Sequence, residues 1–180
     1  MSPAEEHEDS GPRPAAHAAA DHLRKLTLFK DVDGESLAHL ASELPVLALY
    51  AGSAIVTEGE PARDMYLVLS GEVEVVKSRS DSGSTRVALL GAGDWFGESA
   101  LVHSGPRTAT VRTVAPSSVL QLPAARTEQV LSEHDPRAYA TFLRNIVREL
   151  LRRLRAADSL IAHNSDRLAE QYVLERKTTI

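Results

Sequence analysis

One acidic and one basic side chain in the stretch from Phe96 to Val111 have the types and spacing needed to bind a phosphate and its attached sugar. Arg107 carries a planar guanidinium, which matches two phosphate oxygens better than the point charge of a lysine does. Glu98 carries a carboxylate, which only accepts hydrogen bonds, so beside a phosphate it needs a donor such as a sugar hydroxyl. The two residues therefore predict one site, in which Arg107 binds the phosphate and Glu98 binds the sugar.

The residues around Glu98 suit the close approach of an anion to the backbone. Gly97 allows that approach, and Glu98 to Leu101 favour a short helix whose N-terminal N–H groups face the ligand. The alternative is that Glu98 and Arg107 form an ordinary ion pair on a surface loop. The sequence alone leaves both interpretations open.

This run resembles the phosphate-binding cassette of cyclic nucleotide-binding domains, which occur in kinase regulatory subunits, gated channels and bacterial catabolite-activator regulators. In that pattern a Phe-Gly-Glu opening is followed, after a short helix and loop, by Arg-x-Ala-Thr. The matching positions here are Phe96, Gly97, Glu98, Arg107, Ala109 and Thr110. We expect a stand-alone member, because only a short segment follows Leu168 and leaves no room for a DNA-binding helix-turn-helix.

The resemblance implies that Glu98 takes the ribose 2′-hydroxyl and Arg107 the exocyclic phosphate oxygens, with backbone N–H groups near Gly97, Ser99 and Ala100 completing the site. The ligand would be a purine 3′,5′-cyclic monophosphate, cAMP or cGMP. A threonine at the position of Thr108 is typical of cGMP-selective relatives, although channel relatives with this threonine accept both. The expected ligand-binding residues are Phe96, Gly97, Glu98, Ser99, Ala100, Arg107, Thr108 and Ala109, with Arg148 or Arg152 as a lid residue over the base.

The elements that must position this site are predicted to be mainly β-strands with flanking helices. Apolar residues between Leu28 and Leu44 recur at helical spacing. Short β-rich runs separated by turn residues then predict a β jelly-roll barrel, with the polar stretch 78–84 as a hairpin tip. The predicted strands are Val46–Tyr50, Ala54–Thr57, Met65–Leu69, Glu72–Lys77, Thr85–Leu90, Thr110–Val114 and Ser118–Leu122.

A long C-terminal helix is predicted to start at Pro136, where a proline is well tolerated. Apolar residues alternate in steps of four and three along it, which is typical of a coiled-coil dimer. The alternative is a single amphipathic helix packed on its own barrel, and both can hold for different turns. The seam positions are Leu143, Val147, Leu150, Leu154, Ala157, Ile161, Asn164 and Leu168.

The chain is predicted to divide into three parts. Composition indicates a disordered acidic, Pro- and Ala-rich tail (1–22), and the resemblance implies a cyclic nucleotide-binding domain (23–135) followed by a lid and dimerisation helix (136–177). No signal peptide and no membrane-spanning apolar run is present, which predicts a cytoplasmic protein that does not enter a membrane. The absence of cysteine excludes disulfides, thiolate-held clusters and a cysteine nucleophile.

The sequence therefore predicts a non-enzymatic regulator without a catalytic cofactor, which signals to an unknown protein partner through a conformational change. Direct sequence-specific DNA binding is not expected, because the formal net charge is −5. One alternative is a metal-dependent enzyme of the cupin type, but His103 is the only histidine in the strand region. The other is a degenerate domain that serves as a dimerisation scaffold and binds no nucleotide.

Overall fold

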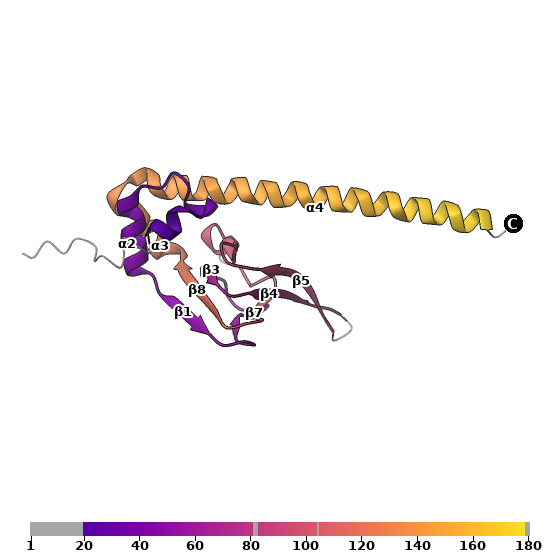
Figure 1. The fold of residues 1–180 in the computed structure, drawn as a ribbon, viewed down its shortest axis with the longest axis horizontal. Helices are drawn as coiled ribbons and strands as arrows, with labels where there is room; N and C mark the ends of the chain where they lie inside the picture. The colour runs from indigo at the N-terminus through magenta and orange to yellow at the C-terminus, as the bar shows by residue number, and fades with distance from the viewer. Residues whose placement is uncertain (1–19, 81–82, 104, 179–180) are drawn as a thin grey trace, which may run out of the picture. The chain divides into compact units, whose positions relative to one another are not determined.

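The computed structural model describes residues 20–80, 83–103 and 105–178, with side chains described up to residue 163. The chain divides into two compact units, Met1–Phe142 and Leu143–Ile180. The first unit contains all the described strands, together with the helices α2 (Gly34–Glu43) and α3 (Ala124–His134) and the beginning of α4 (Pro136–Thr178) (Figure 1).

Two antiparallel sheets of four strands form the centre of the first unit, in the orders β1-β8-β3-β6 and β2-β7-β4-β5. Each sheet has two edge strands, so the sheets pack as a jelly-roll-like sandwich and do not close into the predicted barrel. The mainly β fold with flanking helices is otherwise as predicted. The strands are β1 (Val46–Leu49), β2 (Ala54–Val56), β3 (Asp64–Ser70), β4 (Val73–Ser78), β5 (Ser84–Leu90), β6 (Trp95–Phe96), β7 (Thr110–Thr113) and β8 (Ser117–Pro123).

The predicted strands are all present, and none of their ends shifts by more than one residue. The additional strand, β6, has only two residues and was not predicted, because alternation cannot be recognised over so short a run. The predicted hairpin tip lies between β4 and β5, where the Arg79 amide donates to the Gly83 carbonyl at 2.9 Å. Residues 81 and 82 of this tip lie outside the described residues.

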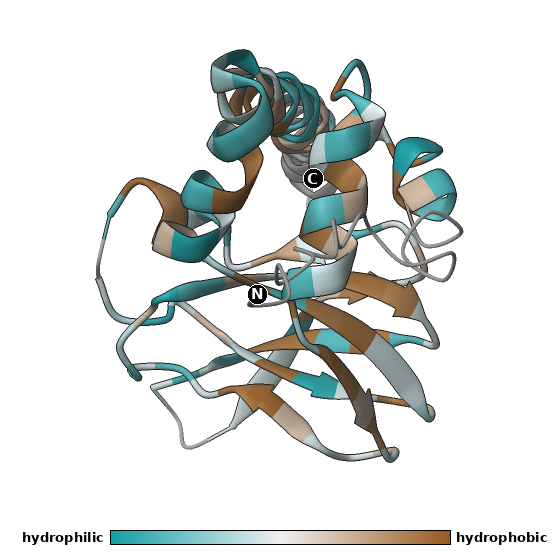
Figure 2. Ribbon diagram, turned by 90° about the vertical axis from the view of Figure 1, so that its left-hand side faces the viewer, coloured by the Kyte–Doolittle hydropathy of each residue, from teal (hydrophilic) through white to brown (hydrophobic). Residues whose placement is uncertain are grey.

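Inward-facing side chains of both sheets make up the core of the sandwich, and hydrophobic and hydrophilic residues alternate along several strands (Figure 2). Tyr66 and Phe96 belong to this core. They lie opposite each other in β3 and β6, at the end of the sheet where the predicted site begins. The buried members are Val56, Tyr66, Val68, Val73, Phe96, Val111 and Val119.

Helices cover one end of the sandwich. The single helix predicted between Leu28 and Leu44 is interrupted: it consists of the 3-10 turn η1 (Thr27–Phe29) and the helix α2 (Gly34–Glu43). The interruption arises because the Asp33 carboxylate accepts from the Ser36 amide at 2.8 Å and caps a new helix there. Sequence reasoning missed α3 (Ala124–His134), which buries Thr127, Val130 and Leu131.

The predicted tail 1–22 lies mostly outside the described residues, since the description starts at Ala20. Residues 20–24 are helical, and Ala20 and Leu23 are each only 3% exposed. These two apolar residues lie three positions apart, so their side chains face the same side of one helical turn, and this side is buried.

The long helix predicted from Pro136 is confirmed as α4 (Pro136–Thr178). Its first turns belong to the first unit, where Phe142 stacks on Phe29 with ring centroids 5.6 Å apart. Within the described residues, the chain has no helix that is both long enough and apolar enough to span a membrane.

Candidate functional site

The predicted site begins where β6 ends. Trp95 and Phe96 are buried and pair with Leu67 and Tyr66 of β3, which fixes the entry to the following turn. Gly97 then adopts a left-handed conformation with φ of +79°, and a 3-10 helix, η2, follows over Glu98–Leu101. The short helix predicted over these residues is therefore confirmed, in the tighter 3-10 form.

Glycine is required at position 97 for two reasons. A side chain is strained at this φ, and a Cβ atom built on Gly97 would lie 2.7 Å from Arg107 Nη1 and 3.0 Å from the Asp64 carbonyl oxygen. The backbone of β6 and the guanidinium of Arg107 thus come together directly at Gly97. The structure brings together the glycine and the arginine that the sequence singled out.

Arg107 is buried, with 8% of its surface exposed. Its Nη1 donates to the Asp64 carbonyl oxygen at 2.8 Å, and its Cζ lies 5.7 Å from the centroid of the Tyr66 ring. Its own backbone is held as well, because the Arg107 amide donates to the Glu60 carbonyl at 2.7 Å and the Arg107 carbonyl accepts from the Gly59 amide at 2.9 Å.

The guanidinium has no acidic partner in the part of the chain whose side chains are described. Among residues 20–80, 83–103 and 105–163, no carboxylate lies within ion-pair distance of Arg107, and Glu98 makes no ion pair with it. The alternative interpretation of a surface ion pair between Glu98 and Arg107 therefore does not hold. A buried cation without a counter-charge is costly to a fold.

The other predicted binding residues differ in their exposure. Phe96 is buried, Glu98, Ala100 and Ala109 are half-buried, and Ser99 and Thr108 are exposed. One backbone donor expected at the ligand is already used, because the Ala100 amide donates to the Gly97 carbonyl at 3.1 Å within the turn.

The predicted lid residues belong to the second unit. Arg148 Nη1 donates to Asn145 Oδ1 at 3.4 Å, and Arg152 Nε and Nη2 donate to the Glu149 carboxylate at 2.8 and 2.6 Å. These contacts all lie within α4. The lid role of Arg148 or Arg152 remains a prediction.

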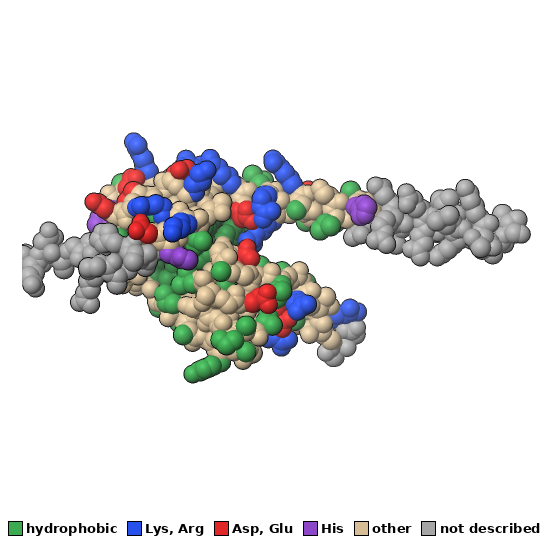
Figure 3. Space-filling view, in the orientation of Figure 1, with side chains coloured by type: hydrophobic (Ala, Val, Ile, Leu, Met, Phe, Trp, Pro, Cys, Tyr) green, Lys and Arg blue, Asp and Glu red, His purple; other side chains and the backbone are tan. Residues whose placement is uncertain are grey.

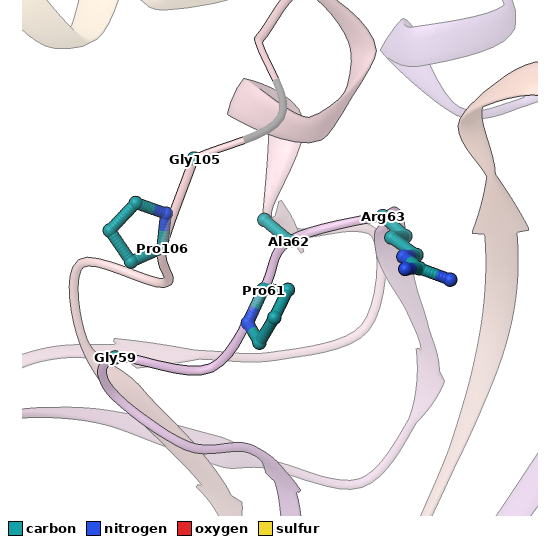
Figure 4. Close-up of a pocket in the computed structure, with 6 residues that line it drawn as sticks. All are labelled: Gly59, Pro61, Ala62, Arg63, Gly105 and Pro106. Carbon is teal, nitrogen blue, oxygen red and sulfur yellow. The ribbon is translucent and has the colours of Figure 1, made fainter.

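A cavity of about 350 Å³ lies beside the backbone of Arg107, between the loop that precedes β3 and the loop that precedes Arg107 (Figure 4). Pro61 and Pro106 form a bridge between the two loops, and the Ala62 amide donates to the Gly105 carbonyl at 2.9 Å. The lining residues are Gly59, Pro61, Ala62, Arg63, Gly105 and Pro106, none of which is among the predicted ligand-binding residues.

Sequence reasoning missed Asp64 and Tyr66, which contact Arg107, and Gln121, which is hydrogen-bonded to Asp64. Asp64 Oδ2 accepts from Gln121 Nε2 at 2.9 Å and from the Tyr66 hydroxyl at 3.4 Å. Burial, followed by the nearby Asp64 carboxylate, raises the pKa of Tyr66. The sequence does contain polar residues at strand positions that face inward. Such positions can be recognised only when the pairing of the strands is known.

Comparison with known proteins agrees with this geometry. Residues 46–134 match the family model described as cyclic nucleotide-binding domain. The chain is 28% identical over 92 residues to a CRP-like cAMP-activated global transcriptional regulator of Mycobacterium tuberculosis, a match covering 51% of this chain and 41% of that protein. It is 42% identical over 89 residues to a cAMP-dependent protein kinase regulatory subunit of Yarrowia lipolytica, covering 49% of this chain and 23% of that protein. The matches thus span less than half of the length of these relatives.

A solved structure gives the same result. The crystal structure of a cyclic nucleotide-binding domain from Methylobacillus flagellatus superimposes with a TM-score of 0.66 at 26% identity, and covers 78% of this chain and 79% of that one. The cassette geometry, the sandwich and these matches converge on one family. Residues 46–134 of this chain form a cyclic nucleotide-binding domain.

Proposed function

We propose that this chain is a non-enzymatic regulatory protein that binds a purine 3′,5′-cyclic monophosphate and transmits the binding event to a partner protein. The observation that carries the proposal is the buried Arg107 guanidinium, which lacks a carboxylate partner within the described residues and adjoins Gly97 at the start of η2. Such a cation is stabilised when a phosphate enters, because the phosphate supplies the missing counter-charge.

The two charged residues divide the ligand between them. One guanidinium nitrogen of Arg107 is used by the Asp64 carbonyl, and the remaining donors are available to the exocyclic phosphate oxygens. Glu98, half-buried at the first position of η2, accepts from the ribose 2′-hydroxyl. Phe96, Ser99, Ala100, Thr108 and Ala109 complete the proposed contacts.

The base is a purine, and both cAMP and cGMP fit the proposal. Thr108 is exposed, so its hydroxyl is accessible to a base amino group. One of the two relatives is a cAMP-activated regulator and the other a cAMP-dependent protein kinase subunit, which makes cAMP the first ligand to test.

In this proposal, the helix α4 transmits the binding event to the partner protein. Figure 3 shows hydrophobic and arginine side chains at the surface of the described part of this helix. Several seam positions are more than half exposed, namely Val147, Leu154 and Ile161 at 53%, 58% and 65%. Such a stripe on a long helix supports pairing with α4 of a second copy, although the side chains of Asn164 and Leu168 lie outside the described residues.

Ligand binding would then shift α4 between two positions, with Arg148 or Arg152 contacting the base in one of them. A ligand changes this balance only to the extent that it binds the two states with different affinities. The partner that reads the change is a protein.

Calorimetric titration with cAMP and cGMP tests the proposal. We expect micromolar or tighter binding that Arg107→Leu abolishes, since loss of one partner of a buried charged contact costs roughly 2–5 kcal/mol. The matched control is Arg112→Leu, which removes an exposed strand arginine paired with Glu74 and should bind normally. Absence of binding by the unmodified protein would instead favour the dimerisation scaffold, and unchanged affinity of Arg107→Leu would overturn the assigned site.

A further inference from the structure

A row of aromatic and polar side chains crosses the inner face of the sheet that contains β3. Tyr66 stands opposite Phe96 of β6 and opposite Gln121 of β8. Residues directly opposite each other in antiparallel strands point to the same face, and this face also carries the buried pair of Val68 and Val119. A tyrosine and a glutamine thus occupy inward positions next to an apolar core, where polar groups are costly unless they are satisfied.

Hydrogen bonds and stacking fix the orientation of the Tyr66 ring. Its hydroxyl and the Gln121 amide both donate to Asp64 Oδ2, at 3.4 and 2.9 Å. The Phe96 ring stacks on Tyr66 with centroids 5.2 Å apart and an interplanar angle of 16°. Tyr66 is therefore held both at its hydroxyl and across its ring.

Arg107 rests on this fixed ring. Its Cζ lies over the Tyr66 ring, 5.7 Å from the centroid, which is within the range of a cation–π contact. Asp64 links the two parts of the arrangement: its carbonyl accepts from Arg107 Nη1 and its carboxylate accepts from the Tyr66 hydroxyl. The arginine and the tyrosine are thus oriented against the same residue of β3.

We infer that Tyr66 is a positioning residue for Arg107: its ring holds the guanidinium in the binding orientation before a ligand arrives. The inference rests on the proposed function, because it assumes that Arg107 is the anion-binding group. A free arginine side chain has many rotamers, and ordering it on binding reduces affinity. A guanidinium already held by a ring and a carbonyl avoids most of that loss.

Two substitutions at Tyr66 separate the ring from the hydroxyl. Tyr66→Leu removes the ring, and we expect cAMP affinity to fall about tenfold, the effect of losing a partly desolvated cation–π contact. Tyr66→Phe keeps the ring and should restore affinity to within about threefold of the unmodified protein. The control is Tyr139→Leu, which removes a half-buried tyrosine ring that stacks on Phe142 and should leave affinity unchanged.

Equal affinity of Tyr66→Leu and the unmodified protein would overturn the inference, as would a Tyr66→Phe protein that binds as weakly as Tyr66→Leu. Failure of the unmodified protein to bind cAMP or cGMP would contradict the proposed function instead. The two failures are therefore distinguishable in one series of titrations.

A measurement on the ligand-free protein tests the positioning directly, even if Tyr66→Leu does not fold. The side-chain N–H resonances of Arg107 should show a ring-current shift in the NMR spectrum of the unmodified protein, and Tyr66→Phe should retain it. Arginine resonances at the positions of a solvent-exposed, freely rotating side chain would show that Tyr66 does not hold the guanidinium, whatever the affinities are.

Discussion

Arg107 and Arg112 lie close together in the sequence, yet the fold treats them in opposite ways. Arg112 points outward from β7 with a side chain that is 51% exposed, and its Nε donates to the Glu74 carboxylate at 2.6 Å. Arg107 is 8% exposed and rests on a backbone carbonyl and a tyrosine ring. The fold thus neutralises the exposed arginine and leaves the buried one without a carboxylate among the described residues.

Under the proposed function, this difference separates an arginine that serves the fold from one that binds a ligand. An exposed ion pair contributes little to stability and needs no further partner. A buried guanidinium without a counter-charge destabilises the folded protein, so its presence is better explained by a ligand than by structure. Residue type alone does not distinguish the two arginines, whereas burial and pairing do.

The largest expected effect concerns stabilisation by the ligand. At a cAMP concentration of 100 times Kd, binding should add about 2.7 kcal/mol to the free energy of unfolding, which raises Tm by roughly 5–11 °C. Arg112→Leu should show the same rise and Arg107→Leu none. A thermal melt with and without cAMP measures this. An equal rise in both variants would remove the distinction between the two arginines.

A second effect concerns the glycine in contact with Arg107. Gly97→Ala and Gly52→Ala each place a side chain at a left-handed position, with φ of +79° and +82°, and each should lose about 1–2 kcal/mol of stability. A Cβ atom on Gly52 would meet nothing within 4 Å, whereas one on Gly97 would displace the guanidinium. Calorimetry should therefore show weaker cAMP binding only for Gly97→Ala. Normal binding by that variant would mean that the orientation of Arg107 is not critical.

The smallest effect is expected on the outer face of the sandwich. Glu74→Ala removes the carboxylate that Arg112 and Arg86 approach at 2.6 and 3.7 Å. Loss of such a surface cluster should reduce the free energy of unfolding by only about 0.2–1 kcal/mol in urea titration, with cAMP affinity unchanged. Weaker cAMP binding in this variant would show that the outer face and the site are coupled.

Local patterns in the sequence predicted most of the strands, the long helix and the central part of the site. Gly97, Glu98 and Arg107 were predictable because they lie in one short motif whose spacing is fixed by the turn and by η2. The motif also predicted that Arg107 binds an anion, which stays a prediction, whereas the burial of its side chain is a feature that only the structure shows.

Features that depend on tertiary contacts were not predictable. Asp64, Tyr66 and Gln121 meet only because β3 pairs with β8 in one particular register, which strands distant in the sequence do not reveal. The helix α3 was missed because its buried face contains Thr127 beside Val130 and Leu131, which weakens the apolar pattern. Whether strands close into a barrel or leave two sheets open depends on the pairing of their edges, which is likewise non-local.

The hydrogen bonds that cross between the two loops beside Arg107 have a consequence for local opening. The amides of Gly59, Ala62 and Arg107 all donate across this junction, so none of them can exchange with solvent unless the two loops separate. The three amides should therefore exchange with deuterium at similar rates, as a single opening unit. A phosphate bound by the Arg107 side chain would slow exchange at Gly59 and Ala62 as well, so protection would extend to a loop on the other side of the junction.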